Sequence, residues 1–246
     1  MRSGLRRNIA AFVPTRIANC AMWLDAGQIT GIADGAALPT WQDKSGNARD
    51  ATQATVSKQP LYRATNAVVP LPNARPVVQF DGVGSVLATS TPANSSNTFT
   101  VFVVCQRTAT STLDEPVFTN RNPASSTPIA AQIGFASTNV LRQDYRNDAN
   151  VIVQSQSALT YPIAVYHQFE ATSDGTTASS LVDGSQVSSG AVPAGAVTTT
   201  NTYLANDSAT FYAPLLIAEV ISYSRGLTTT ERQQVEAYLK TKYGTP

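Results

Sequence analysis

The chain has 246 residues, of which 42% are hydrophobic and 13% are charged, with a formal net charge of +1. This hydrophobic fraction excludes an intrinsically disordered chain, and charged residues are about half as frequent as the ~25% usual in soluble domains. The small net charge provides no field that attracts nucleic acid, and no stretch approaches the roughly 18 apolar residues of a membrane span. We therefore expect neither nucleic acid nor a membrane as a partner.

The N-terminal residues are basic. The first sixteen residues contain no acidic residue and four arginines, which are Arg2, Arg6, Arg7 and Arg16. Two interpretations stay open: a basic arm that docks on an acidic partner surface, or an ordinary disordered terminus. The apolar stretch 9–13 is too short for a signal peptide and is followed by Pro14, so no secretion signal is expected. We predict an arm over residues 1–20 and one β-sandwich domain over residues 21–246.

Short apolar runs separated by Gly, Pro, Asn and Asp predict many strands along the rest of the chain. The strongest is Thr98–Arg107, where apolar residues on both faces indicate a central strand covered on both sides. Asp174-Gly175 and Asp183-Gly184 are typical hairpin turns. Other strands are expected at 21–25, 40–42, 60–63, 77–80, 116–119, 131–136, 140–145, 151–156, 163–171, 179–183, 202–206 and 215–223. This pattern predicts an all-β sandwich.

The C-terminal residues predict a single helix. Thr228 is a candidate N-cap, and Glu231 three residues later completes a capping box. Val235 and Leu239, with Tyr238 beside them, form an apolar stripe at helical spacing. Gly244 is placed as a C-terminal stop. We expect this helix to pack across one edge of the sandwich as a structural lid.

Six segments carry a recognisable pattern in order. They are Trp23-Leu-Asp-Ala26, the Trp-Gln-Asp-Lys-Ser-Gly-Asn run at 41–47, the stretch 53–60, the Arg-Pro-Val-Val-Gln-Phe-Asp-Gly run at 75–82, Leu181-Val-Asp-Gly184, and the strand and helix over 217–243. This set resembles the laminin-G-like (concanavalin A-like) family in the version common in bacteriophage and bacterial surface proteins. The resemblance implies a two-sheet jelly-roll β-sandwich with one C-terminal α-helix. It does not fix a function, because this fold hosts lectins, glycosidases, adhesins and capsid or tail modules.

No cofactor or metal site is predicted. In the family, Phe-Asp-Gly is often followed by a second acidic residue, but here Asp81 is the only acid between Phe80 and Val86. Calcium needs several oxygen ligands, so calcium is not supported and Asp81 is expected to cap its own loop. Cys20 and Cys105 are too few for a disulfide scaffold, and whether they pair stays open.

No catalytic set is predicted either. His167 is the only histidine and is expected as a packed residue on the strand 163–171, because a triad needs further partners. Glycosidases of this fold use two or three acids on one strand, and no such string occurs. Glu219 is isolated among apolar residues, so we expect it to bond backbone or pair with Arg225.

A candidate ligand-binding group is formed by Arg142, Tyr145 and Asp148. An aromatic ring can stack on a sugar, and an acid can accept bonds from its hydroxyls. The alternative is a solvated hairpin tip. Trp23 and Trp41 lie in the structural motifs of the family and are expected to pack in the core.

These observations and the resemblance together predict a non-enzymatic bacteriophage virion structural protein on the particle surface. It would decorate the capsid or belong to the tail, with a capacity to bind glycans. Its partners would be other virion proteins, docked through the basic arm, and it would form a homo-oligomer on the particle. The alternative is a carbohydrate-binding, lectin-like module of a bacterial surface or secreted protein, located outside the cell.

Overall fold

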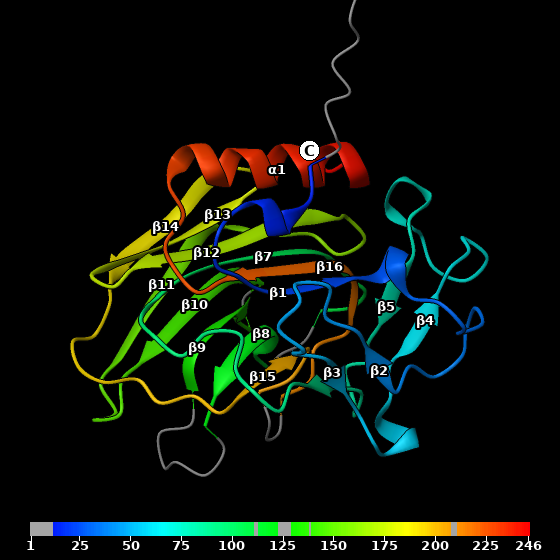
Figure 1. Ribbon diagram of the computed structural model, residues 1–246, viewed down its shortest axis with the longest axis horizontal. Helices are drawn as coiled ribbons and strands as arrows, with labels where there is room; N and C mark the ends of the chain where they lie inside the picture. Colours follow the sequence, from blue (N-terminus) through cyan, green and yellow to red (C-terminus); the bar gives the residue numbers. More distant parts are fainter. Residues whose placement is uncertain (1–11, 111–112, 123–128, 138, 208–210) are drawn as a thin grey trace, which may run out of the picture.

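The computed structural model describes residues 12–110, 113–122, 129–137, 139–207 and 211–246. Within these ranges the chain forms two antiparallel eight-stranded sheets and one α-helix (Figure 1). The predicted two-sheet β-sandwich with one C-terminal helix is therefore confirmed.

The first sheet contains the two longest apolar strands at its centre. Its strand order is β14 (Ser185–Ala191), β13 (Thr177–Val182), β12 (His167–Asp174), β7 (Thr98–Arg107), β16 (Leu215–Tyr223), β5 (Val77–Gln79) and β4 (Leu61–Arg63), and β1 (Cys20–Asp25) also pairs with β16.

The second sheet packs against one face of the first. Its strand order is β11 (Ile152–Thr160), β10 (Val140–Arg146), β9 (Ile129–Phe135), β8 (Glu115–Arg121), β15 (Asn201–Leu204), β6 (Leu87–Ala88), β3 (Ala51–Thr52) and β2 (Thr40–Trp41). Four short 3-10 helices lie in the connections: η1 (Pro14–Arg16), η2 (Ala26–Gln28), η3 (Val56–Lys58) and η4 (Pro72–Ala74).

The main core lies between the sheets and is rich in aromatic rings. Phe99 of β7 stacks on Tyr145 of β10 with ring centroids 5.8 Å apart, and Phe135 of β9 meets Phe169 of β12 edge to face at 5.1 Å. Trp41 is completely buried in the same core. The packing of Trp41 agrees with its prediction as a structural residue.

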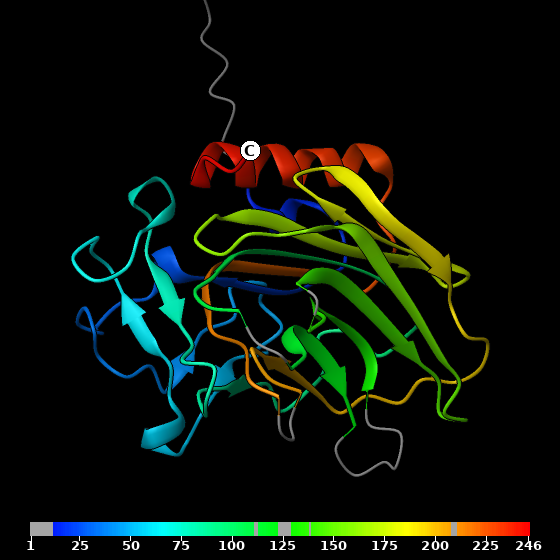
Figure 2. The same cartoon turned by 180° about the vertical axis from the view of Figure 1, so that it is seen from behind.

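The α-helix α1 (Thr229–Tyr243) covers the opposite face of the first sheet, as both ribbon views show (Figures 1 and 2). Thr228 and Glu231 form the predicted capping box, and Gly244 ends the helix at φ 67°. Val235 and Leu239 are buried against the outer residues of β7 and β16. The first sheet is thus covered on both faces, which explains why its central strands are apolar throughout.

A buried polar network fixes α1 to the first sheet. The Glu219 carboxylate of β16 accepts hydrogen bonds from Trp23 Nε1 at 2.6 Å and from Tyr243 OH at 2.6 Å. Lys242 Nζ lies 2.7 Å from Glu219 Oε2 and 2.6 Å from Asp25 Oδ2. The predicted pairing of Glu219 with Arg225 is wrong, because the helix supplies nearer donors.

Arg225 instead forms an ion pair with Glu231, with Nη2 and Oε1 2.6 Å apart. Both residues flank the start of α1, so this pair holds the connection between β16 and the helix. Arg225 therefore takes no part in the buried network around Glu219.

The local predictions differ from the structure in a few places. The strand expected over 163–171 begins only at His167, and Ile163 and Val165 before it are 41% and 39% exposed. The two hairpin turns are where the sequence predicted them, between β12 and β13 and between β13 and β14. Strands β3, β6 and β14 were not predicted: β3 and β6 have two residues each, and β14 has no regular alternation of apolar residues.

Part of the predicted arm packs on the domain. The Phe12 ring lies 5.4 Å from the Tyr238 ring of α1, and the buried Pro14 carbonyl accepts a hydrogen bond from Tyr223 OH at 3.0 Å. Arg16 is exposed at the end of η1. Arg2, Arg6 and Arg7 lie outside the described residues.

Both cysteines are free thiols, which settles the question of their pairing. Cys105 is buried, and burial raises the pKa of Cys20 to about 12.

Among the residues with assigned structure, no helix has the length and apolarity of a bilayer span.

Candidate functional site

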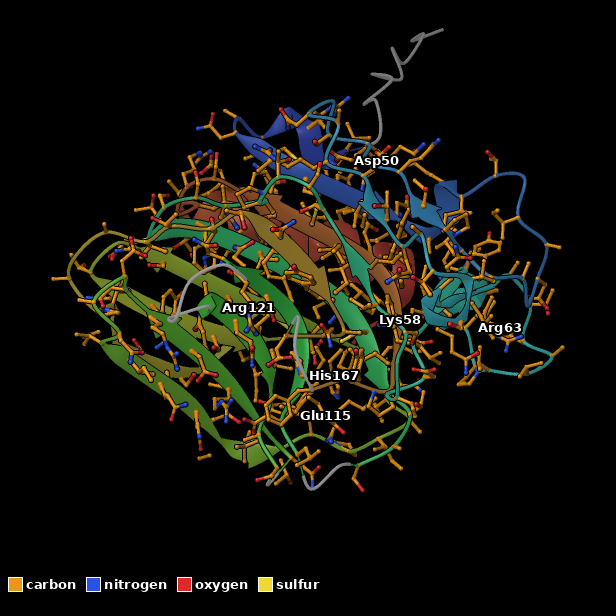
Figure 3. The ribbon with its side chains drawn as sticks, turned by 90° about the horizontal axis from the view of Figure 1, so that it is seen from below. Asp50, Lys58, Arg63, Glu115, Arg121 and His167 are labelled. Atoms are coloured by element: carbon orange, nitrogen blue, oxygen red, sulfur yellow. The ribbon has the colours of Figure 1, made fainter. Side chains whose placement is uncertain are left out.

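The side chains of strand β10 alternate between the core and the outer face of the second sheet. Gln143 and Tyr145 point to the core, because Ser180 Oγ of the first sheet donates to Gln143 Oε1 at 2.8 Å and Tyr145 stacks on Phe99. Side chains alternate along a strand, so Arg142, Asp144 and Arg146 belong to the outer face. That face lies on the side of the molecule away from α1, from which Figure 3 is drawn.

A row of polar residues crosses this outer face. Thr119 of β8 is in register with Gln132 of β9, which is in register with Asp144 of β10, which is in register with Gln154 of β11. Thr119, Gln132 and Asp144 are buried although they lie outside the core. Apolar residues would make this face a second core surface, and the polar row indicates a face that meets water or a polar ligand.

Arg142 is held by two acidic residues. Its Nη2 lies 2.7 Å from Asp114 Oδ2 and 2.9 Å from Asp144 Oδ2. Burial alone would lower the pKa of Arg142, but the hydrogen bonds to Asp114 and the charge of Asp144 outweigh it and raise that pKa. Arg142 is therefore a fixed cation with a defined orientation.

Asp144 is the least satisfied member of this group. It is only 7% exposed, and its Oδ1 atom has no hydrogen-bond partner within the described residues. Burial raises the pKa of Asp144 even though the charge of Arg142 and the contacts of Arg142 and the Gln154 amide with the carboxylate lower it. A buried carboxylate oxygen without a donor is costly, so this atom is the natural acceptor for a ligand hydroxyl.

These side chains line a hollow of about 210 Å³ on the outer face. Its walls are formed by residues of β10, β11 and the segment before β8: Asp114, Arg142, Asp144, Tyr145, Arg146, Ile152 and Gln154. The lining combines cationic donors, amide groups, carboxylate acceptors and one apolar side chain. Such a set suits a small, polyhydroxylated ligand.

Two of the three predicted ligand residues, Arg142 and Tyr145, line this hollow, and only Arg142 directs its side chain to the outer face. Tyr145 cannot offer its ring to a sugar, because the side chain is 2% exposed and its OH accepts from Gln143 Nε2 at 2.5 Å. The prediction of an aromatic platform at Tyr145 is corrected by the alternation of the strand, which sends Arg142 and Tyr145 to opposite faces.

Asp148 lies outside the hollow and braces a loop. Its carboxylate accepts hydrogen bonds from the Thr198 backbone N at 2.9 Å and from Thr198 Oγ1 at 2.8 Å. This pairing ties the β10–β11 connection to the segment before β15. Asp148 therefore has a structural use that the sequence did not reveal.

His167 is a packed residue, as predicted. The Nδ1 atom of His167, which is labelled in Figure 3, lies 2.6 Å from Asp183 Oδ2, and the His167 ring contacts those of Tyr161 and Phe169. Asp183 also accepts from the Gln168 backbone N, so the pair closes the β13–β14 turn onto β12.

Asp81 caps its own loop, as predicted. One carboxylate oxygen, Oδ1, accepts from the backbone N of Val83, Gly84 and Ser85 at 2.9–3.0 Å. Burial opposes the charge, but these bonds lower the pKa of Asp81 to about 2.

In the part of the chain that the structure describes, no cluster of three His, Cys, Asp or Glu residues is placed to hold a metal ion.

No protein-family model and no curated protein matches the chain. Solved structures with a similar fold include the Trypanosoma rangeli sialidase, at 16% identity and a TM-score of 0.64 over 93% of this chain and 34% of that one. The binding domain of Paraclostridial Mosquitocidal Protein 1 is similar at 12% identity and a TM-score of 0.65 over 95% of this chain and 56% of that one.

The ligand binding domain of Botulinum neurotoxin serotype D, solved in complex with N-acetylneuraminic acid, is similar at 11% identity and a TM-score of 0.62. That match covers 93% of this chain and 54% of the other. The chain thus spans between about a third and just over half of the proteins that it resembles. Identities at this level show a shared sandwich fold and nothing finer.

Proposed function

We propose that this protein is a lectin-like glycan-binding module that takes one sugar unit in the hollow beside Arg142. The observation that carries the proposal is the buried Asp144 Oδ1 atom, which lacks a donor among the described residues although it lies at a hollow lined by polar groups. A sugar hydroxyl supplies the missing donor, and Gln154 or Arg146 supplies donors to neighbouring hydroxyls. Small rotamer changes on binding are enough to let the hydroxyl in.

The size of the hollow also favours a small ligand. Its volume of about 210 Å³ is below the ~300–1,000 Å³ of pockets for drug-sized ligands. Two of the similar structures are binding domains, one of them solved with a bound sugar acid. This likeness supports a binding role at the level of the fold.

We propose that the module has no catalytic activity. Asp114 and Asp144 both contact Arg142, and only Asp144 keeps an oxygen without a partner among the described residues, so the hollow lacks the second free carboxyl that glycoside hydrolysis uses. The buried acids Asp25 and Glu219 lie beneath α1, 4% and 1% exposed, and share Lys242. We expect no sugar release from any oligosaccharide that the protein binds.

A test of the binding site uses a glycan array with the full chain and its Asp144→Ala variant. Wild-type protein is expected to bind a defined group of glycans, and Asp144→Ala to bind them at least about tenfold more weakly, since it removes a charged hydrogen-bond acceptor. Asp34→Ala is the matched control, because Asp34 is exposed and bonds only Ala64 and Thr65. Equal binding by Asp144→Ala and wild type would place the site elsewhere.

We further propose that the module is carried on the surface of a bacteriophage particle. Phe12, where the described chain begins, packs against α1, and α1 covers the face of the sandwich opposite to the hollow. An arm that docks on a virion protein from this side would leave the glycan-binding face turned to the solvent. A module on a bacterial surface or in the extracellular medium is the alternative.

Deletion of residues 1–11 tests this placement, because the residues from Phe12 onward that pack on the sandwich stay in place. The truncated protein is expected to keep its glycan affinity and to lose its place on purified particles, as quantitative mass spectrometry of the particles measures. Absence of the full-length protein from particles would favour the extracellular module.

A further inference from the structure

Two arginines, Arg121 and Arg146, lie near one another at the outer face of the second sheet, and Arg146 lines the hollow. Arg121 is the last residue of β8 and Arg146 the last residue of β10, and β9 is the only strand between them. Arg121 is in register with Ile129, and Tyr145 with Ala131. Two strand spacings separate the backbones by about 10 Å, so two arginine side chains can reach one small group between them.

Arg146 is a cation without compensation. It is half-buried and lines the hollow, yet it makes no ion pair or side-chain hydrogen bond within the described residues. Its neighbours Arg142, Asp114 and Asp144 are already engaged with one another. A partly desolvated guanidinium with no acceptor favours an anion.

Arg121 adds a second set of donors that is only partly used. Its Nη1 atom donates to the Asp207 carbonyl oxygen and forms an ion pair with Asp207 Oδ2 at 3.4 Å, whereas its buried Nε has no partner among the described residues. Burial lowers the pKa of Arg121 by more than the charge of Asp207 raises it, and the positive charge of Arg146 contributes a smaller lowering, so the two cations repel one another. An anion placed between them would relieve this repulsion.

Charge is therefore divided along this face. Arg146 and Arg121 form a positive end over β8 and β10, whereas the unpaired oxygen of Asp144 offers an acceptor in the neighbouring row. Tyr203 of β15 is half-buried next to Thr119 of β8, and its hydroxyl interacts electrostatically with Arg121. A ligand that suits this arrangement carries an anionic group at one end, hydroxyls at the other and some apolar surface.

We propose that the ligand is an acidic sugar, whose carboxylate binds between Arg146 and Arg121 while one of its hydroxyls donates to Asp144. This inference rests on the proposed glycan-binding function and names the class of sugar. Planar guanidinium groups bind carboxylates through paired hydrogen bonds. A neutral sugar would leave the Arg146 charge without an acceptor.

The probes are N-acetylneuraminic acid, glucuronic acid and the methyl ester of each, titrated into the full chain and followed by NMR. Each ester keeps the shape of the sugar and lacks the negative charge. We expect at least one acid to bind about tenfold or more tightly than its ester, because a charge-assisted bond is lost in the ester. Raising the salt concentration should weaken binding of the acid and not that of the ester.

The variant Arg146→Gln is expected to reduce affinity for the acid by about tenfold and to leave the ester unchanged. Arg146→Lys should restore part of the loss, because it keeps the charge without the planar fork. Arg75→Gln is the matched control: Arg75 is exposed beside α1 on the opposite side of the molecule. Thermal unfolding of each variant verifies that it is folded.

The outcomes separate the two proposals. Equal affinity for acid and ester, or an Arg146→Gln variant that binds the acid as wild type does, overturns the acidic-sugar assignment. If neutral glycans then bind and lose affinity in Asp144→Ala, the glycan-binding function stands. If no acidic or neutral glycan binds at all, both proposals fail.

Discussion

Two buried carboxylates on opposite outer faces of the sandwich, Glu219 and Asp144, differ in the number of donors that they receive. Under α1, the Glu219 carboxylate receives donors from Trp23, Tyr238, Lys242 and Tyr243, so neither oxygen is left open. On the other outer face, Asp144 receives Arg142 at one oxygen and nothing at the second within the described residues. The comparison teaches that a saturated carboxylate stabilises the fold, whereas an unsaturated one at a hollow is a candidate binding group.

The largest effect is expected from Glu219→Ala. This change leaves the buried donors of Trp23 and Tyr243 without an acceptor and deprives Lys242 of one of its two acids. We expect the free energy of unfolding to fall by about 3–5 kcal/mol, as measured by urea titration. Glycan affinity of the folded variant should not change, because the sheet core separates the two faces; a parallel loss of affinity would show that they are coupled.

A smaller effect, dependent on pH, is expected from Glu170 beneath α1. Its carboxyl lies 3.1 Å from Arg232, yet burial raises its pKa to about 8, from 4.5 in the unfolded chain. Between these pH values the unfolded state binds fewer protons than the folded state, so stability falls as pH rises. We expect a fall of roughly a few kcal/mol from pH 4.5 to 8 that Glu170→Gln removes.

Urea titrations of wild type and Glu170→Gln at several pH values measure this difference. Parallel stability curves for the two proteins would mean that Arg232 keeps Glu170 ionised. In that case Glu170 would join Glu219 as a saturated carboxylate under the helix.

The smallest effect is expected from Asp148→Ala on the second sheet. Asp148 is exposed, and its two bonds to Thr198 fix a loop outside the hollow. We expect a loss of about 1 kcal/mol or less in unfolding free energy and no change in glycan affinity. A loss of affinity comparable with that of Asp144→Ala would extend the site to the β10–β11 connection, where the sequence placed it.

Local signals predicted much of the fold. The capping box at Thr228, the stop at Gly244 and the long apolar strand β7 each depend on residues close in sequence, and each is present in the structure. The partners of Glu219 could not be predicted in this way. Trp23 is 196 positions away, and the helical donors face Glu219 only once α1 has docked.

The candidate site was predictable in part. Arg142 stands out as a charged residue on an expected strand, and alternation alone assigns Asp144 and Arg146 to its face and Tyr145 to the other. Asp114 and Arg121 reach β10 across two strand pairings, β8 with β9 and β9 with β10, and the first of these contains bulges. Their approach therefore depends on a register that no local pattern encodes. The lack of a donor for Asp144 Oδ1 among the described residues likewise depends on the assembled sheet and could not be predicted from the sequence.

The chain has two tryptophans, one between α1 and the first sheet and one between the two sheets. Trp23 donates its indole N–H to Glu219 beneath α1, whereas Trp41 is sealed between the sheets. Their fluorescence therefore reports two different events, detachment of the helix and melting of the sandwich. In the Trp41→Phe variant, the fluorescence of Trp23 reports only the detachment of α1. Comparing its thermal transition with that of the wild type shows whether α1 detaches before the two sheets separate.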